Sequence, residues 1–84
     1  MVKVLVVDDD SGLRMSVRSA LEVQAGRFEI DEAFDGVNAL EKIKVKRPDV
    51  VLLDVDMPRM NGLATLKAIK EQDPSVIVII MTAR

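Results

Sequence analysis

The chain has 84 residues, of which 49% are hydrophobic and 31% are charged, and its net charge is −2. This balance is typical of a single globular domain and excludes a disordered or a membrane-spanning chain. Cysteine and histidine are both absent, which excludes a disulfide framework, a thiolate metal site and histidine-based catalysis. The twelve basic residues are scattered along the sequence, so we expect no direct binding of nucleic acid by this segment.

Residues 2–7 are β-branched and almost entirely apolar, which predicts a strand covered on both faces of a parallel sheet. In residues 11–25 the apolar period becomes that of an amphipathic helix, which Gly26 closes. The face that we expect to be buried carries Leu13, Val17, Ala20, Leu21 and Gln24. The face that we expect to meet solvent carries Arg14, Arg18 and Glu22.

Residues 28–31 alternate between apolar and polar side chains, a pattern that predicts a strand at the edge of the sheet. Asp35 and Gly36 then open a second helix. Pro48 biases Arg47 toward an extended conformation, so this helix should be finished by there. The positions that we expect this helix to bury are Val37, Leu40 and Ile43.

Residues 50–53 have no polar face, which predicts a strand in the centre of the sheet that ends at Asp54. Residues 55–62 contain Pro58, Asn61 and Gly62, which predicts a loop leading to a third helix capped by Asn61. The expected buried stripe of this helix is Leu63, Leu66 and Ile69. After a break at residues 73–74, the segment 75–81 predicts a fourth strand, which stops at Thr82.

Strands and helices therefore alternate, which predicts an α/β fold: an open parallel sheet with helices on both faces. In such a sheet, ligands bind beyond the carboxyl ends of the strands. If the second strand is an edge, the first and third strands are neighbours, and the crevice opens between them. We then expect the carboxylates of Asp8, Asp9 and Asp54 to converge at that edge.

Crowded carboxylates repel one another unless they are protonated or bind a cation. Oxygen ligands favour a hard ion, and Mg²⁺ suits this set better than Ca²⁺ because the acidic residues come from separate strands. An aspartate at such a site is already ionised at neutral pH and can act as a nucleophile toward phosphorus. The sequence therefore predicts an Mg²⁺-assisted phosphoacceptor at Asp54, with Thr82 donating a hydrogen bond to the phosphoryl group.

Three motifs resemble those of the receiver domains of two-component response regulators. They are Val-Val-Asp-Asp at residues 6–9, Leu-Leu-Asp-Val-Asp-Met-Pro-Arg-Met-Asn-Gly at residues 52–62, and Met-Thr-Ala at residues 81–83. The resemblance implies that Asp54 is the phosphorylated residue and that Asp9 binds Mg²⁺ directly, while Asp8 acts largely through water. It also implies that the backbone carbonyl of Asp56 is a further metal ligand, and that the hydroxyl of Thr82 couples the phosphoryl group to a rearrangement.

The same resemblance implies a flavodoxin-like fold of strand order 2-1-3-4-5, the order for which the chemotaxis receiver is a standard example. We expect residues 1–84 to form the N-terminal part of one receiver domain, with four strands in the order 2-1-3-4 and three helices. The fourth helix, the fifth strand and the fifth helix of the family are then missing, together with the family's lysine after the fifth strand. Such a chain should be able to associate with itself through its exposed fourth strand and uncovered sheet face.

A receiver domain implies a sensor histidine kinase or phosphotransfer protein as its partner, and an output domain outside this chain. It is modified once and is not a turnover enzyme. The N-terminus has no signal-peptide pattern, so a cytoplasmic location is the expectation, without membrane attachment.

Other interpretations stay open at this point. Asp10 is expected to cap a helix rather than to bind metal, and Met57 and Met60 to fill gaps in packing. The chain could be a receiver-like binding module that is not phosphorylated. It could also be a fragment of a haloacid-dehalogenase-type phosphatase, with Asp56 as general acid and base, although Pro58 does not fit that motif.

Overall fold

The computed structural model describes residues 1–24, 26–56 and 61–81, in which strands and helices alternate. The strands are β1 (Val2–Val7), β2 (Phe28–Ala33), β3 (Val50–Asp54) and β4 (Ile77–Met81). The helices are α1 (Ser11–Glu22), α2 (Gly36–Lys46) and α3 (Gly62–Gln72). None of these described helices has the length and hydropathy needed to cross a membrane.

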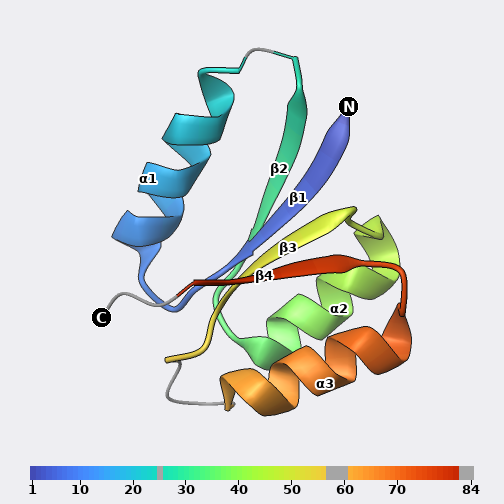
Figure 1. Ribbon diagram of the computed structural model, residues 1–84. Helices are drawn as coiled ribbons and strands as arrows, with labels where there is room; N and C mark the ends of the chain where they lie inside the picture. The colour runs from blue at the N-terminus through green and yellow to red at the C-terminus, as the bar shows by residue number, and fades with distance from the viewer. Residues whose placement is uncertain (25, 57–60, 82–84) are drawn as a thin grey trace.

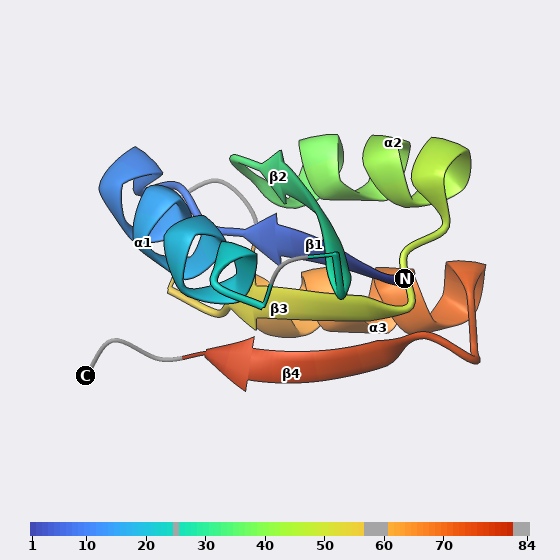
Figure 2. The ribbon, with the colours of Figure 1, turned by 90° about the horizontal axis from the view of Figure 1, so that it is seen from above.

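The strands form one parallel sheet in the order β2-β1-β3-β4, as the sequence predicts. Helix α1 lies on one face of the sheet, and α2 and α3 lie next to each other on the opposite face (Figures 1 and 2). Because all four strands run in the same direction, their carboxyl ends meet at a single edge of the sheet. The residues that follow β1 and β3 are therefore close neighbours at this edge.

The hydrophobic core lies between the sheet and the helices α2 and α3. Its buried members are Leu5, Val7, Ala33, Ala39, Ile43, Val51, Leu53, Ile69 and Val76. Val4 and Val6 of β1 point to the α1 face and are buried as well, so the second half of this strand is covered on both faces. A fully buried aliphatic side chain contributes about 1.5 to 3 kcal/mol to folding, and β1 and β3 therefore form the most firmly held part of the sheet.

The buried stripes of α2 and α3 differ from the predicted ones. Val37 and Leu63 are 59% and 68% exposed, whereas Ala39 and Thr65 are fully buried, each one turn before a buried isoleucine. A spacing of three residues rotates the side chain by about 60° per step, whereas a spacing of four rotates it by only about 40°. The 39/43 and 65/69 pairs therefore remain on one face, while the three-residue stripes drift away from it.

Helix α1 also departs from its prediction. It ends at Glu22 rather than at residue 25, and none of its residues is fully buried. The arginines that the sequence pattern placed on the solvent face, Arg14 and Arg18, are half-buried and contact Glu32 at the end of β2. Arginine can reach around an apolar surface with its long stem, so the simple division of α1 into an apolar and a polar face was wrong.

The ends of the elements follow local chemistry. Asn61 caps α3, and its side-chain oxygen accepts a hydrogen bond from the Leu63 amide at 2.7 Å. At Gly62 a Cβ atom would overlap the backbone of Val55, so only glycine lets α3 start this close to the loop after β3. Arg47, expected to be extended, instead ends α2 in the left-handed conformation at φ 47°. There its amide bonds to a carbonyl of the last turn.

Two strand boundaries also differ from expectation. Strand β2 continues to Ala33, two residues beyond the predicted end, and β4 starts only at Ile77. Within the described residues β4 is an edge strand, paired on one side with β3. Three of its side chains, Ile77, Ile79 and Ile80, are 40 to 59% exposed.

Candidate functional site

Three acidic side chains meet where β1 and β3 end. Asp8 and Asp9 follow β1, and Asp54 is the last residue of β3. Each of them offers a carboxylate oxygen, and these three oxygens lie within 4.8 Å of one another. The structure therefore brings together residues that are far apart in the sequence, because β1 and β3 are direct neighbours in the sheet.

Asp8 is the most deeply buried member of this acidic cluster, with 1% of its surface exposed. One carboxylate oxygen, Oδ1, accepts a hydrogen bond from the Asp10 amide at 2.9 Å. Its other oxygen, Oδ2, is buried and has no hydrogen-bond partner among the described residues. Burial raises the pKa of Asp8 despite the Asp10 amide bond, and the negative charges of Asp54 and Asp9 raise this pKa further.

The other two members differ in exposure. Asp9 is exposed, whereas Asp54 is only 7% exposed. The Oδ1 atom of Asp54 accepts a hydrogen bond from the Asp56 amide at 2.9 Å. This contact fixes the Asp54 side chain and leaves its second carboxylate oxygen for another partner. The side chain of Asp56 is exposed.

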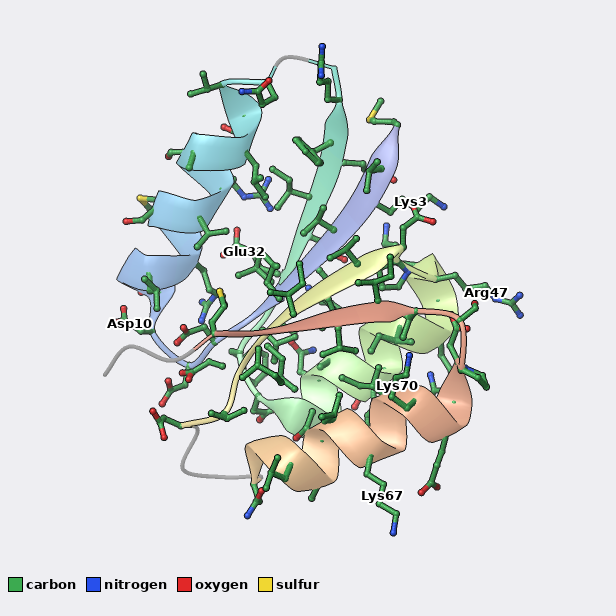
Figure 3. The ribbon with its side chains drawn as sticks, in the orientation of Figure 1. Lys3, Asp10, Glu32, Arg47, Lys67 and Lys70 are labelled. Carbon is green, nitrogen blue, oxygen red and sulfur yellow. The ribbon has the colours of Figure 1, made fainter. Side chains whose placement is uncertain are left out.

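Asp10, although adjacent to the cluster, belongs to α1. Its Oδ1 atom accepts hydrogen bonds from the amides of Gly12 at 2.8 Å and Leu13 at 3.2 Å. The predicted capping role of Asp10 is confirmed. This side chain lies at the first turn of the helix in Figure 3.

The acidic cluster fits a hard divalent cation. All of its donors are oxygens, and a buried carboxylate oxygen without a partner is costly unless a proton or a cation satisfies it. Ligand oxygens on one Mg²⁺ ion lie about 3 to 4 Å from one another, because each is about 2.1 Å from the metal. The three oxygens, which lie within 4.8 Å of one another, are close to such spacings.

The sequence interpretation missed a group of side chains behind the cluster. Glu32 accepts hydrogen bonds from Arg14 and Arg18, and Arg14 also reaches the backbone of Asp8. In Figure 3, Glu32 lies between β2 and α1. The strand alternation contained the signal, because Glu32 shares a face with the apolar Phe28 and Ile30. A charge on that face requires partners from the helix that covers it.

The family model of the response regulator receiver domain matches residues 4–84. The chain belongs to this family. The receiver-domain resemblance and the flavodoxin-like sheet order predicted from the sequence are thereby confirmed.

Similar proteins include two curated relatives. The receiver chain is 41% identical over 81 residues to a protein-glutamate methylesterase/protein-glutamine glutaminase of Geobacter metallireducens, covering 96% of this chain and 23% of that protein. It is 40% identical over 83 residues to the response regulator MprA of Mycobacterium ulcerans, covering 99% of this chain and 35% of that protein. The receiver chain thus spans about a quarter to a third of the length of these relatives.

A solved structure of similar fold is the response regulator TrrA from Thermotoga maritima in complex with Mg²⁺-BeF. It has a TM-score of 0.91 and 33% sequence identity, and the match covers all of this chain and 71% of that one. A CheY-like receiver domain from Methanospirillum hungatei has a TM-score of 0.92 at 26% identity, covering all of this chain and 66% of that one.

Part of the predicted site lies outside the described residues. Thr82, the expected hydrogen-bond donor to the phosphoryl group, is among them, as are Met57, Pro58 and Met60. Their predicted roles stay predictions. The described part of the receiver site therefore consists of the acidic cluster, the Asp56 backbone and the side chains behind Asp8.

Proposed function

We propose that this receiver chain is a phosphoacceptor, in which Asp54 takes a phosphoryl group with the help of Mg²⁺. The observation that carries the proposal is the acidic cluster at the carboxyl edge of the sheet, with a buried oxygen on Asp8 that has no partner in the described part of the chain. The family match and the Mg²⁺-BeF complex of the similar TrrA structure support it. The ligands for Mg²⁺ would be Asp8, Asp9, Asp54 and the backbone carbonyl of Asp56.

In the proposed reaction, the free carboxylate oxygen of Asp54 attacks the phosphorus of a phosphohistidine. The new bond joins this oxygen to phosphorus, the phosphorus–nitrogen bond breaks, and the leaving imidazole takes a proton from solvent. When bound, Mg²⁺ supplies positive charge that offsets the repulsion between the carboxylates and the phosphoryl oxygens. The Asp56 amide holds the first oxygen of Asp54 at 2.9 Å, so the attacking oxygen is presented in one orientation.

The donor in this proposal is a sensor histidine kinase or a phosphotransfer protein, and the readout is an output domain outside this chain. The short coverage of the curated relatives fits a receiver that operates within a longer protein. Thr82 remains the proposed donor of a hydrogen bond to the phosphoryl group. A cytoplasmic location stays a prediction.

Intact-mass measurement after incubation with Mg²⁺ and acetyl phosphate tests the proposal. We expect the wild-type chain to gain one phosphoryl group and Asp54→Asn to gain none. Asp56→Asn is the matched control, because it removes the same charge from an exposed side chain two residues away. The Asp56→Asn variant should still be phosphorylated, since its backbone carbonyl is unchanged. A phosphatase that used Asp56 as general acid and base would instead lose turnover in this variant.

The receiver-like binding module is the second possibility, and the same experiment separates it. Binding of Mg²⁺ by the wild-type chain without any gain in mass would support the binding-only interpretation. A gain in mass that persists in Asp54→Asn would contradict the assignment of the acceptor.

A further inference from the structure

Arg14 connects the acidic cluster to the rest of the sheet. It lies in the first turns of α1, and its side chain is only 16% exposed. Its Nε donates a hydrogen bond to Glu32 Oε1 at 3.1 Å, and its Nη1 donates one to the backbone carbonyl of Asp8 at 2.6 Å. One planar guanidinium therefore joins β2 to the residue that follows β1.

The carbonyl that Arg14 holds belongs to the peptide between Asp8 and Asp9. A peptide unit is planar, so fixing this carbonyl also fixes the position from which the Asp9 side chain starts. The Asp8 amide is held on its other side by the Ala33 carbonyl at 3.1 Å. The backbone at the centre of the cluster is thus held by β2 on one side of Asp8 and by α1 on the other.

Glu32 is a firm anchor for this arrangement. Its second carboxylate oxygen accepts a hydrogen bond from Arg18 at 2.8 Å, and Arg18 also donates to the Ile30 carbonyl at 3.2 Å. From the opposite face of the sheet, Lys42 of α2 donates to the backbone carbonyl of Glu32. Arg18 therefore shares the anchor with Arg14, but its hydrogen bonds within the described residues go to Glu32 and Ile30 and not to Asp8.

We propose that Arg14, held by Glu32, is a positioning residue for the metal site, because it fixes the Asp8–Asp9 peptide from which two of the carboxylates extend. This inference rests on the proposed Mg²⁺ binding and adds to it residues from α1 and β2. Partners that orient metal ligands typically change metal affinity by about 10- to 100-fold when they are removed. We expect the loss of Arg14 to fall within this range.

A purely electrostatic role predicts the opposite sign. Arg14 is a positive charge close to an anionic site, so its removal would strengthen the attraction between the cluster and Mg²⁺. If Arg14 acted only through its charge, Arg14→Met would bind Mg²⁺ more tightly. If Arg14 positions the peptide, the same variant binds Mg²⁺ more weakly. The direction of the change therefore decides between the two roles.

The experiment compares wild type, Arg14→Met and Arg18→Met by calorimetric titration with MgCl₂. Arg18→Met is the matched control, since it removes the same charge and the same Glu32 partner and leaves the Asp8 contact. Amide hydrogen exchange in metal-free buffer is the second readout, followed at Asp8 and Asp10. Arg14→Lys keeps the charge but cannot span both partners, so it serves if the methionine variant does not fold.

We expect Arg14→Met and Arg14→Lys to weaken Mg²⁺ binding and to speed exchange at Asp10, whose amide donates to the Asp8 side chain. Arg18→Met should lose stability while retaining Mg²⁺ affinity and the slow exchange. Equal or tighter Mg²⁺ binding by Arg14→Met, or an equal weakening by Arg18→Met, would overturn the inference. If wild type does not bind Mg²⁺, the proposed function fails. The exchange at Asp10 then decides by itself whether Arg14 orders this backbone.

Discussion

Replacing Asp8 by asparagine should stabilise the metal-free protein and at the same time reduce its affinity for Mg²⁺. The carboxylate of Asp8 is buried, its pKa is raised by that burial, and its Oδ2 has no partner among the described residues. Asparagine has nearly the same shape, and its amide oxygen can still accept the hydrogen bond from the Asp10 amide. Its NH₂ group can donate to Asp54, so a repulsive contact becomes an attractive one.

The magnitude follows from the cluster geometry. Two unit charges at the upper limit of the cluster's separations, 4.8 Å, repel each other by about 3.5 kcal/mol at an effective dielectric constant of about 20. Asp9 is exposed, so solvent screens the repulsion between Asp9 and Asp8. We therefore expect Asp8→Asn to gain about 1 to 2 kcal/mol in the free energy of unfolding. For a domain of this size, that gain corresponds to a rise in Tm of about 5 to 15 °C.

Thermal unfolding followed by far-ultraviolet circular dichroism measures this effect, since the chain has no tryptophan or tyrosine for fluorescence. Glu41→Gln is the control, because it removes one negative charge from an exposed position on α2. Its Tm should stay close to that of wild type. Added Mg²⁺, at 100 times its dissociation constant, should raise the free energy of unfolding of wild type by about 2.7 kcal/mol. The same Mg²⁺ concentration should stabilise Asp8→Asn much less. A lower Tm for Asp8→Asn in metal-free buffer would refute the reasoning.

Three other changes test separate parts of the fold. Hydrogen bonds from its two arginine partners lower the pKa of Glu32. Its contribution should therefore be present above pH of about 4.5 and be lost as the pH falls through the lowered value. Glu32→Gln should lower the free energy of unfolding by about 1 kcal/mol near neutral pH, and this deficit should close in acid. The exposed Glu29→Gln should show no such trend. Gly62→Ala should lower the free energy of unfolding, measured by chemical denaturation, by about 2 to 4 kcal/mol because the added Cβ has no space. Gly12→Ala is the control: a Cβ there would meet only a side-chain oxygen, so the loss should be less than about 1 kcal/mol. If the chain pairs through the edge of β4, Ile79→Lys should shift its sedimentation toward the monomer, and a wild-type monomer at every concentration would contradict self-association.

The sheet order and the convergence of the acidic residues could be predicted because they depend on few features. An apolar run with no polar face identifies a central strand, and an alternating run identifies an edge. Parallel strands then place their following residues at one edge, whatever the packing in between. The proximity of Asp8 and Asp54 could therefore be predicted without any knowledge of side-chain contacts.

The helix faces could not be predicted as well, because their orientation depends on the three-dimensional shape of the sheet. Apolar residues that recur every three positions are compatible with several rotations of the helix about its axis. Packing against β1 and β3 selects one of these rotations. Val37 and Leu63 lie in the first turns of their helices and are exposed. Thr65 is polar by type and was overlooked, yet its hydroxyl donates to the Asn61 carbonyl at 3.1 Å, which allows its burial.

The failed prediction of the α1 faces concealed a contact between Glu32 and two arginines of that helix. On a strand face that otherwise carries Phe28 and Ile30, a charged residue is unfavourable unless a partner of opposite charge covers it. The partners come from α1, whose arginines were assigned to the solvent face on the basis of helix periodicity alone. Considering β2 and α1 together would have paired Glu32 with Arg14 and Arg18, since a carboxylate on that face needs positively charged partners from the helix that covers it. The same pairing places a guanidinium on the Asp8 carbonyl, so the interface that helps to hold α1 on the sheet also bears on the geometry of the acidic cluster.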